Sequence, residues 1–200
     1  MKPGSSHCGL RYYTSVRASL SRAIIVIPCI KEATMKLKGS CHCGAVKFTV
    51  DSHTPQPFMR CYCSICRKTA GGGGYAINIM GETATLKVTG AKNVGVYRAR
   101  IKDKGAKRGT RGTLSQARRN FCAKCASALW VWDPQWPEWV YPFASAIDTP
   151  LPKPKQDIEL MLNYAAPWAD VPKGRAHKHY REYPKESIAG WHKKHGLEVR

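Results

Sequence analysis

The feature that most constrains this 200-residue chain is the grouping of its cysteines: seven of the nine fall into three short clusters. Within a cluster the cysteines are two or three positions apart, so two thiolates can reach one metal ion, and zinc prefers four sulfur or nitrogen ligands in a tetrahedron. Seven ligands divide into a closed set of four and an open set of three. The sequence therefore predicts two zinc ions, one structural and one with a position left for chemistry. The clusters are Cys41-His42-Cys43, Cys61-Tyr62-Cys63-Ser64-Ile65-Cys66 and Cys122-Ala123-Lys124-Cys125.

Nine cysteines are also compatible with a disulfide framework, but the sequence favours metal binding. The count is odd, the spacings are those of metal sites, and we expect no secretory signal peptide. These features indicate a reducing compartment, so the predicted localisation is cytoplasmic. Cys8 and Cys29 lie outside the clusters and are expected to be ordinary thiols.

The chain is strongly basic, with a formal net charge of +20. Such a charge favours anionic partners, which include carboxylate-rich small molecules, phosphates and nucleic acids. Basic residues are spread from Lys2 to Arg200 rather than massed in one block, so a solvated basic surface is equally consistent with the charge. The apolar run from Ala23 to Ile27 is much shorter than the roughly 20 residues that span a membrane, and no membrane partner is expected.

Composition divides the chain into three predicted parts: an N-terminal extension (residues 1–34), a zinc-binding body (35–148) and an extended C-terminal segment packed on that body (149–200). Residues 1–31 contain no Asp or Glu and resemble a mitochondrial presequence, which would imply a mitochondrial location. We favour the alternative that translation begins at Met35 and that the preceding residues are an upstream extension. Near the end of the chain, the stretch from Pro184 to Gly196 predicts a short helix.

Alternating apolar and polar residues predict several short strands. Glycines and prolines separate them, and the Lys/Gly/Arg-rich stretch from Lys102 to Gly112 is expected to be an exposed loop. Many short strands with one terminal helix indicate a mainly β fold built from antiparallel sheets. The predicted strands span residues 45–50, 75–80, 85–88, 94–101, 128–132 and 139–143.

Three motifs surround the clusters: GSCHCGAVKF (39–48), RCYCSICRK (60–68) and NFCAKCASALW (120–130). In this order they resemble the glutathione-dependent formaldehyde-activating enzyme family, to which centromere protein V also belongs. The resemblance covers about residues 38–148, and residues 186–197 are similar to the ending of some members. It implies an Mss4-like (β-tent) fold with two zinc sites. The structural zinc and the second, three-ligand zinc are implied on Cys41, Cys43, Cys122 and Cys125 and on Cys61, Cys63 and Cys66, respectively.

The resemblance also implies an activity, the condensation of glutathione with formaldehyde to S-(hydroxymethyl)glutathione, which is a carbon–sulfur lyase reaction in reverse. The second zinc would hold the glutathione sulfur as a thiolate or polarise the formaldehyde oxygen, which makes its three cysteines the predicted catalytic residues. Basic residues beside this site would hold the two glutathione carboxylates, although a solvated surface charge is the alternative for each. These predicted substrate-binding residues are Arg60, Arg67 and Lys68.

Two other functions stay open at this point. A non-catalytic zinc module with a basic surface would bind nucleic acid or chromatin, as the relation to centromere protein V allows. A related enzyme would act on another small thiol or its adducts. Thiols add to formaldehyde readily without help, and Tyr62 occupies a position where many members of the family have His.

The remaining features have plain structural interpretations. The run from Gly71 to Gly74 predicts a flexible turn, with an open approach for an anion as the alternative. The aromatic residues from Trp130 to Phe143 are expected to be mostly core, with Trp136 and Trp139 the most exposed. Two pairs of histidines have spacings that a metal could use but are expected on a polar surface: His177 with His179, and His192 with His195.

Overall fold

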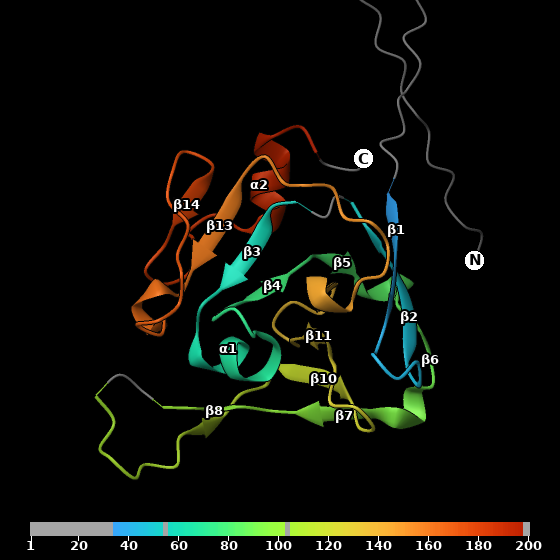
Figure 1. Cartoon of the computed structure of the whole chain (residues 1–200), viewed down its shortest axis with the longest axis horizontal. Coiled ribbons are helices and arrows are strands. Elements are labelled where there is room, and N and C mark those ends of the chain that lie inside the picture. Colours follow the sequence, from blue (N-terminus) through green and yellow to red (C-terminus); the bar gives the residue numbers. More distant parts are fainter. Residues whose placement is uncertain (1–33, 54–55, 103–104, 198–200) are drawn as a thin grey trace, which may run out of the picture. The chain divides into compact units, whose positions relative to one another are not determined.

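A computed structural model of the chain describes residues 34–53, 56–102 and 105–197. The predictions for residues 1–33 therefore lie outside the described residues. Within the described ranges the chain forms short β-strands in four sheets together with two short α-helices, which confirms the predicted mainly β fold (Figure 1). None of the helices in these ranges combines the length and apolar character that a membrane span requires.

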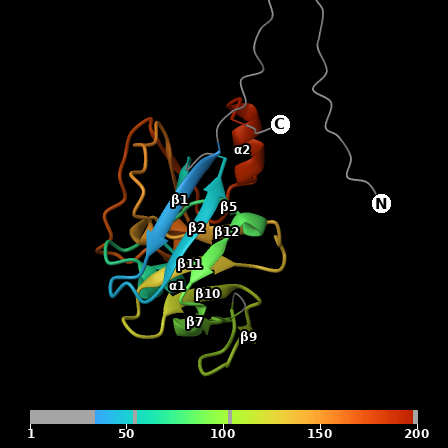
Figure 2. The same cartoon turned by 90° about the vertical axis from the view of Figure 1, so that its right-hand side faces the viewer.

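The first sheet is antiparallel and shows the alternation of apolar and polar residues that a half-buried sheet requires. Leu37, Phe48 and Val50 are buried, whereas the neighbouring lysines are exposed. Gly39 lies opposite Phe48, and a Cβ at this position would lie 2.3 Å from the Phe48 ring. The strands of this sheet are, in order, β1 (Met35–Ser40), β2 (Lys47–Ser52) and β6 (Lys87–Thr89) (Figure 2).

The second sheet is also antiparallel and packs against the first to form the main core. Leu129, Trp130 and Val140 are buried, and the Trp130 ring meets Phe48 edge-on with ring centroids 5.3 Å apart. Trp136, which precedes the strand that begins at Trp139, is 57% exposed, as expected for an aromatic residue among prolines. The strands of this sheet are, in order, β5 (Gly81–Glu82), β12 (Trp139–Pro142), β11 (Ala128–Trp132), β10 (Arg118–Cys122) and β7 (Val94–Tyr97).

The third sheet is mixed, so it adds two parallel pairs to the antiparallel arrangement of the other sheets. Its strand from the C-terminal segment, β13, pairs in parallel on both sides, with β3 and with β14. Parallel neighbours need a long connection, and here the whole second sheet separates β3 from β13 along the chain. The strands are, in order, β14 (His177–His179), β13 (Asp157–Leu160), β3 (Phe58–Cys61) and β4 (Ala76–Asn78).

Two helices and a hairpin complete the described part. Helix α1 (Ser64–Ala70) begins three residues after β3 ends at Cys61, and α2 (Ile188–Lys194) is the predicted C-terminal helix. Helix α2 begins later than predicted because the Ser187 hydroxyl caps it, accepting a hydrogen bond from the Gly190 N–H at 3.0 Å. The hairpin of β8 (Arg100–Ile101) and β9 (Thr113–Leu114) projects away from the larger sheets (Figure 1). Short 3-10 turns occur at Thr83–Thr85, Ala91–Asn93, Ala144–Ala146 and Leu162–Tyr164.

Candidate metal centres and thiol site

The first and third cysteine clusters lie together at the ends of β1 and β10. Cys41 and Cys43 lie in the turn after β1, Cys122 ends β10, and Cys125 lies in the turn that leads to β11. The four sulfur atoms lie within 4.8 Å of one another, with Sγ–Sγ distances of 3.6 Å between Cys41 and Cys43 and 3.8 Å between Cys43 and Cys122. A tetrahedral zinc with Zn–S bonds of about 2.3 Å holds its sulfurs about 3.8 Å apart, so this donor set fits zinc.

The two turns of this group share a backbone conformation. The residue after the second cysteine of each pair is left-handed, with φ 71° at Gly44 and 61° at Ala126. In the first turn the Gly44 N–H donates to the Cys41 carbonyl at 2.9 Å, and in the second the Ala126 N–H donates to the Cys122 carbonyl at 2.8 Å. Each turn thereby directs both of its cysteines to one side, and the two turns face each other.

Ser127 links the two turns of the four-cysteine group. Its hydroxyl lies 3.2 Å from the Cys125 sulfur and, together with the Ser127 backbone N–H, lowers the pKa of Cys125 to about 5. The same hydroxyl oxygen accepts a hydrogen bond from the backbone N–H of His42 at 3.1 Å. A thiol with a lowered pKa is prepared for metal binding, because the ligand form of cysteine is the thiolate.

The second cluster forms a separate group of three sulfur atoms, again within 4.8 Å of one another. Cys61 ends β3, Cys63 is the N-cap of α1, and Cys66 lies in the first turn of that helix, where its N–H donates to the Cys63 sulfur at 3.3 Å. Cys61 and Cys66 are each 5% exposed, whereas Cys63 is only partly buried, so the group is accessible on the Cys63 side. No other His, Cys, Asp or Glu of the described ranges joins it.

Shared hydrogen bonds determine how the thiols of this second group ionise. Hydrogen bonds from the Cys61 and Cys66 thiols lower the pKa of Cys63 to about 2, and donation to Cys63 and Cys66 raises the pKa of Cys61. One negative charge is thus shared by three sulfurs, and a metal ion would displace the other protons. Three thiolates suit zinc and leave one position of its tetrahedron free.

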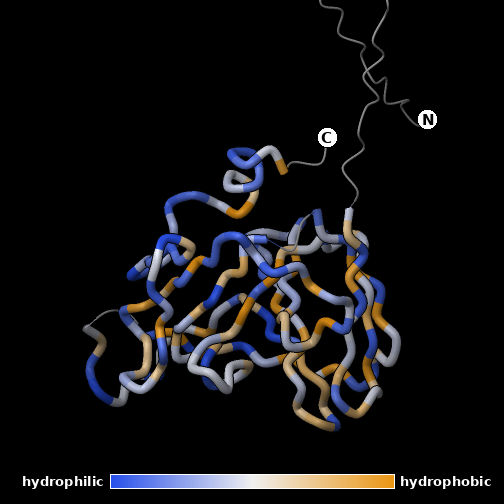
Figure 3. Tube along the Cα trace, turned by 45° about the horizontal axis from the view of Figure 1, so that its top comes forward, coloured by the Kyte–Doolittle hydropathy of each residue, from blue (hydrophilic) through white to orange (hydrophobic). Residues whose placement is uncertain are grey.

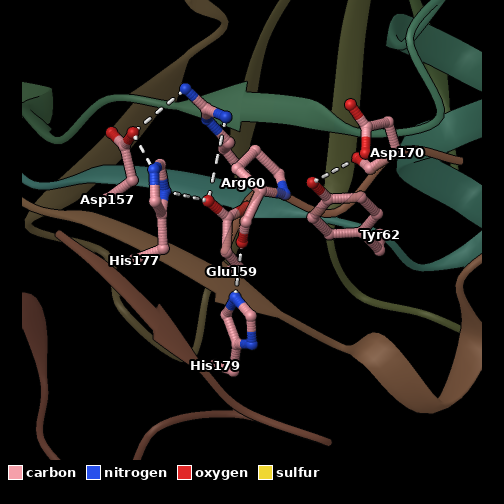
Figure 4. Close-up of polar contacts among 8 residues, drawn as sticks. Arg60, Tyr62, Asp157, Glu159, Asp170, His177 and His179 are labelled. Carbon is pink, nitrogen blue, oxygen red and sulfur yellow. Dashed lines mark hydrogen bonds and ion pairs between the residues drawn. The ribbon is translucent and has the colours of Figure 1, made fainter. Parts of the chain in front are cut away.

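Arg60, one of the predicted substrate-binding residues, has its charge paired inside the protein (Figure 4). Its Nη2 lies 3.0 Å from Asp157 Oδ2 and its Nη1 lies 3.7 Å from Glu159 Oε1. His177 Nδ1 bridges the same two carboxylates, 3.0 Å from Glu159 and 3.6 Å from Asp157. The two acids and His177 could together hold a metal ion, but the guanidinium already supplies the cation and would repel another.

Tyr62, in the middle of the second cluster, is fully buried beside this ion-pair group. Its hydroxyl donates to the backbone carbonyl of Asp170 at 3.3 Å (Figure 4). The centroid of its ring lies 5.1 Å from that of the Tyr75 ring. Burial, followed by the nearby Glu159 carboxylate, raises the pKa of Tyr62. A packed layer of aromatic and charged side chains therefore supports the backbone that carries the three cysteines.

The other basic residues near the second cluster differ in burial. Lys68 is exposed on α1, whereas Arg67 is partly buried and its Nε has no hydrogen-bond partner among the described residues. Sequence reasoning missed Arg119 on β10. Despite the opposing hydrogen bond from Cys61, hydrogen bonding to Cys63 and burial raise the pKa of Cys66, and the positive charge of Arg119 also opposes this rise. The pair Arg118-Arg119 ahead of the third cluster could have revealed it. Successive residues of a strand point to opposite faces, so one of two adjacent arginines is expected to face inward.

Two adjoining cavities lie near the second cluster. The residues that line the smaller cavity, of about 270 Å³, include Arg119, Ala128 and Phe143, and the last two belong to or pack on the apolar cluster that contains Cys61 and Cys66. The larger, of about 490 Å³, is lined by Cys41 of the four-cysteine group and by mainly small polar residues. Thr69 and Ala128 line both cavities, which are therefore neighbours.

The glycine run and the histidine pairs have structural explanations. A Cβ at Gly71 would lie 1.9 Å from the Tyr75 carbonyl oxygen, and Gly74 has φ 92°, so both glycines are required by the turn after α1. The expectation of a surface position is wrong for His192, which is 3% exposed and bonds through Nε2 to the Gln56 carbonyl. The expectation is wrong because α2 packs on the third sheet, which the sequence around His192 does not reveal.

Comparisons with known proteins identify relatives of the chain. The family model described as "Glutathione-dependent formaldehyde-activating enzyme" matches residues 36–160, which include all seven clustered cysteines. This chain belongs to the glutathione-dependent formaldehyde-activating enzyme family. It is 53% identical over 164 residues to a Halomonas elongata protein whose name provisionally gives it the same activity, and the alignment covers 82% of this chain and 99% of that protein. A solved Rhodobacter sphaeroides protein is 29% identical, with a TM-score of 0.43, and the match covers 57% of this chain and 91% of the other.

The region that matches the glutathione-dependent formaldehyde-activating enzyme family extends from β1 to the end of β13. Strand β14 and helix α2 lie beyond the family match, yet they complete its third sheet and its second apolar cluster. Within the described ranges, His177 of β14 is the residue outside the match that reaches the ion-pair group beside Tyr62. The C-terminal segment thus supports the strand that ends at Cys61.

Proposed function

We propose that this chain is a zinc enzyme of the carbon–sulfur lyase type that handles glutathione and its formaldehyde adduct. The observation that carries the proposal is the second cluster, where three sulfur ligands lie within 4.8 Å and no fourth ligand joins them in the described ranges. The family description and the name of the Halomonas relative support glutathione and formaldehyde as reactants. We assign a structural zinc to the four-cysteine group and a catalytic zinc to the three-cysteine group.

The proposed reaction needs no oxidant or reductant. The glutathione sulfur bonds to the formaldehyde carbon, the carbonyl π bond breaks, and the thiol proton ends on the oxygen, giving S-(hydroxymethyl)glutathione. When bound to Cys61, Cys63 and Cys66, zinc supplies Lewis acidity, which lowers the pKa of a thiol or polarises a carbonyl oxygen. The reverse reaction cleaves the carbon–sulfur bond of the adduct.

The chain itself contributes positioning and a restricted approach. Cys61 and Cys66 are buried among apolar side chains that include Phe143 and Leu160, so reactants and water approach from the side of Cys63. Holding thiol and aldehyde in one geometry removes part of the entropic barrier. Because the uncatalysed addition is already facile, we expect a modest rate enhancement. The site needs reduced thiols, and the described cysteines are free, so we place the enzyme in the cytoplasm.

Zinc counting and exchange spectroscopy test this proposal. Native mass spectrometry should find two zinc ions on the wild-type chain and one on Cys63→Ser. In an equilibrium mixture of glutathione and ¹³C-formaldehyde, the wild type should accelerate exchange between free and adduct carbon, and Cys63→Ser should not. Cys29→Ser, which removes a thiol outside the clusters, is the matched control. Equal exchange rates in wild type and Cys63→Ser would refute catalysis at this site.

One observation favours a second function, nucleic-acid binding. The β8–β9 hairpin projects from the sheets, and its connecting loop is hydrophilic (Figure 3). From Arg98 to Arg111 the sequence contains seven Lys or Arg and a single acidic residue. Ile101 and Leu114 on the paired strands are 50% and 38% exposed. A projecting basic ribbon with apolar residues at its base suits contact with phosphates along a groove.

A salt titration tests the nucleic-acid function. If the ribbon binds duplex DNA, the logarithm of the affinity falls linearly with the logarithm of the salt concentration, by roughly 0.9 per phosphate contact. The double variant Lys107→Gln/Arg108→Gln should then reduce the slope by about 2. The control Lys153→Gln/Lys155→Gln removes the same charge from exposed positions elsewhere and should leave the slope unchanged. Equal slopes for the hairpin variant and the wild type would exclude the ribbon.

A further inference from the structure

Arg119 is a partly buried cation that forms no ion pair with any residue of the described ranges. It lies on β10 in the interior of the second sheet, between Val131 of β11 and Tyr97 of β7. Its Nε and Nη1 atoms are buried and have no hydrogen-bond partner in the described part of the chain, and no carboxylate of that part forms an ion pair with it. Buried donors are nearly always satisfied in native proteins, so an unpartnered guanidinium is evidence for a missing ligand.

Among the described arginines, Arg119 has two buried nitrogens without a hydrogen-bond partner, whereas Arg60 and Arg67 each have one. Arg118, the neighbour of Arg119, is exposed, and its guanidinium lies over the Trp132 ring at 5.2 Å. Arg60 is buried to a similar depth, but Asp157 and Glu159 pair with it. Arg119 is less exposed to solvent than Arg118 and, unlike Arg60, forms no ion pair with an acid of the described ranges. Burial of an unpaired charge is costly.

The Arg119 side chain also borders a cavity. Arg119 lines the cavity of about 270 Å³, and the other lining residues include Phe143 and Ala128, which belong to or pack on the apolar cluster that contains Cys61 and Cys66. Apart from Arg119, this cavity is mainly apolar, with Phe121 and Tyr97 in its wall. An apolar pocket with one convergent cation is the usual form of a site for a small organic anion. Thr69 connects it to the larger cavity, which leaves room for a longer molecule.

We propose that Arg119 is the anion anchor of the three-cysteine site and makes that site select thiols that carry a carboxylate, an inference that rests on the function proposed above. Three thiolates and a Zn²⁺ ion sum to one negative charge, and a thiolate ligand adds another. A ligand that also brings a carboxylate therefore needs a cation nearby, and a guanidinium can bind both carboxylate oxygens through two parallel hydrogen bonds. Arg119 supplies that cation in a cavity that shares Phe143 and Ala128 with the apolar cluster around Cys61 and Cys66.

A different role for Arg119 makes a different prediction. If Arg119 only balanced the charge of the metal centre, its removal would weaken the binding of the metal and would weaken the binding of all thiols by the same factor. If Arg119 anchors a carboxylate, its removal weakens the binding of thiols that carry a carboxylate and leaves the binding of neutral thiols unchanged. Two small thiols of nearly equal size separate these roles: 3-mercaptopropionate carries a carboxylate where 2-mercaptoethanol carries a hydroxyl.

The test uses the full chain with Co²⁺ in place of zinc, because a thiol that enters the open position changes the thiolate-to-cobalt absorption. Arg119→Gln should bind 3-mercaptopropionate at least about tenfold more weakly than the wild type, since hydrogen bonds to a charged group are lost. Its affinity for 2-mercaptoethanol should stay within about twofold. Arg119→Lys, which keeps the charge without the planar fork, should fall between. Arg118→Gln, an equal loss of charge one residue away, should match the wild type.

Each remaining outcome overturns the anchor. If Arg119→Gln binds both thiols more weakly by the same factor, Arg119 only balances the charge of the metal centre. If it binds both thiols as tightly as the wild type does, Arg119 takes no part in thiol binding. If neither thiol alters the cobalt spectrum of the wild type, the thiol-binding function itself fails and the anchor fails with it. Because that last result appears in the wild type, it is distinguishable from failure of the anchor alone.

Discussion

The sulfur of Cys43 lies 3.8 Å from the sulfur of Cys122, which is 79 positions further along the chain. A metal ion between them closes a long loop, and ordering such a loop is costly without a crosslink. Treated like a disulfide that closes a loop of this length, the link contributes on the order of 4 kcal/mol. The four-cysteine group therefore connects the first sheet to the second, in addition to the apolar core that the two sheets share.

Loss of Cys122 should be far more destabilising than loss of Cys63. We expect Cys122→Ser to lower the free energy of unfolding by about 4 kcal/mol, because the long loop is no longer closed. Cys63→Ser should lose clearly less of the free energy of unfolding, since the three cysteines of the second cluster span only residues 61–66 and a metal ion bound to them closes a short loop. Urea unfolding followed by circular dichroism measures both. Similar losses in the two variants would contradict the separation into a structural and a catalytic site.

The three cysteine clusters could be recognised from the sequence because ligand spacing is a local property, whereas the union of the first and third clusters in one site was implied by the family resemblance. The strands at residues 47–52, 76–78, 87–89, 94–97, 128–132 and 139–142 were predictable for a similar reason, since alternation along a half-buried strand is visible in a short window. Strand β3 was not predicted, because it is only four residues long and leads directly into a cysteine cluster. Its neighbour in the sheet, β13, comes from a distant part of the chain, and spacing carries no information about such a pairing.

Strand β13 itself was also not predicted from the sequence. Its four residues, Asp-Ile-Glu-Leu, are all buried, with Glu159 completely inaccessible. Buried acids are rare unless they are paired, and the partners here, Arg60 and His177, come from two other strands. For the same reason Arg60 was assigned to substrate: its position beside Cys61 is visible in the sequence, whereas its buried partners are not.

Removal of Arg60 should strongly destabilise the fold. In Arg60→Met the carboxylates of Asp157 and Glu159 stay buried without their cation, and we expect a loss of about 3–5 kcal/mol in the free energy of unfolding. The exposed Arg181→Met should change this free energy by no more than about 0.5 kcal/mol. Chemical denaturation of both variants provides the comparison.

A rescue variant separates this charge effect from lost packing. Neutralising both acids, with Asp157→Asn and Glu159→Gln, in the Arg60→Met background should recover part of the stability. If the triple variant is less stable than Arg60→Met, or if Arg60→Met resembles Arg181→Met, the buried carboxylates do not depend on Arg60.

Ala126 offers a stabilising substitution in the four-cysteine group. Its φ of 61° is a left-handed conformation that costs an L-residue roughly 1–2 kcal/mol, and glycine adopts it without this cost. Ala126→Gly should therefore raise the free energy of unfolding by about 1 kcal/mol, after the greater entropy of the unfolded glycine is subtracted. Ala123→Gly, in the same turn but without a positive φ, should be neutral or destabilising. Thermal unfolding of the zinc-loaded variants measures both, and an equal response would show that the conformation of Ala126 carries no strain.

His192 should make stability depend on pH. Burial, opposed by its bond to the Gln56 carbonyl and reinforced by His53 and His195, lowers the pKa of His192 below its ordinary value of 6.5. Below pH 6.5 the unfolded chain therefore takes up a proton that the folded chain does not bind until its lower pKa is reached. The free energy of unfolding should thus be constant with respect to this group above pH 6.5 and fall as the pH drops.

Urea unfolding at several values between pH 5 and pH 8 tests this dependence. His192→Gln cannot take up the proton, so its stability should fall less steeply below pH 6.5 than that of the wild type, even if it is less stable at pH 8. His179→Gln removes an exposed histidine and should retain the wild-type slope. The difference in slope, rather than in absolute stability, is the informative quantity, because loss of packing at α2 shifts the stability equally at every pH. Identical slopes for the wild type and His192→Gln would mean that His192 binds its proton equally well in the folded and unfolded chains.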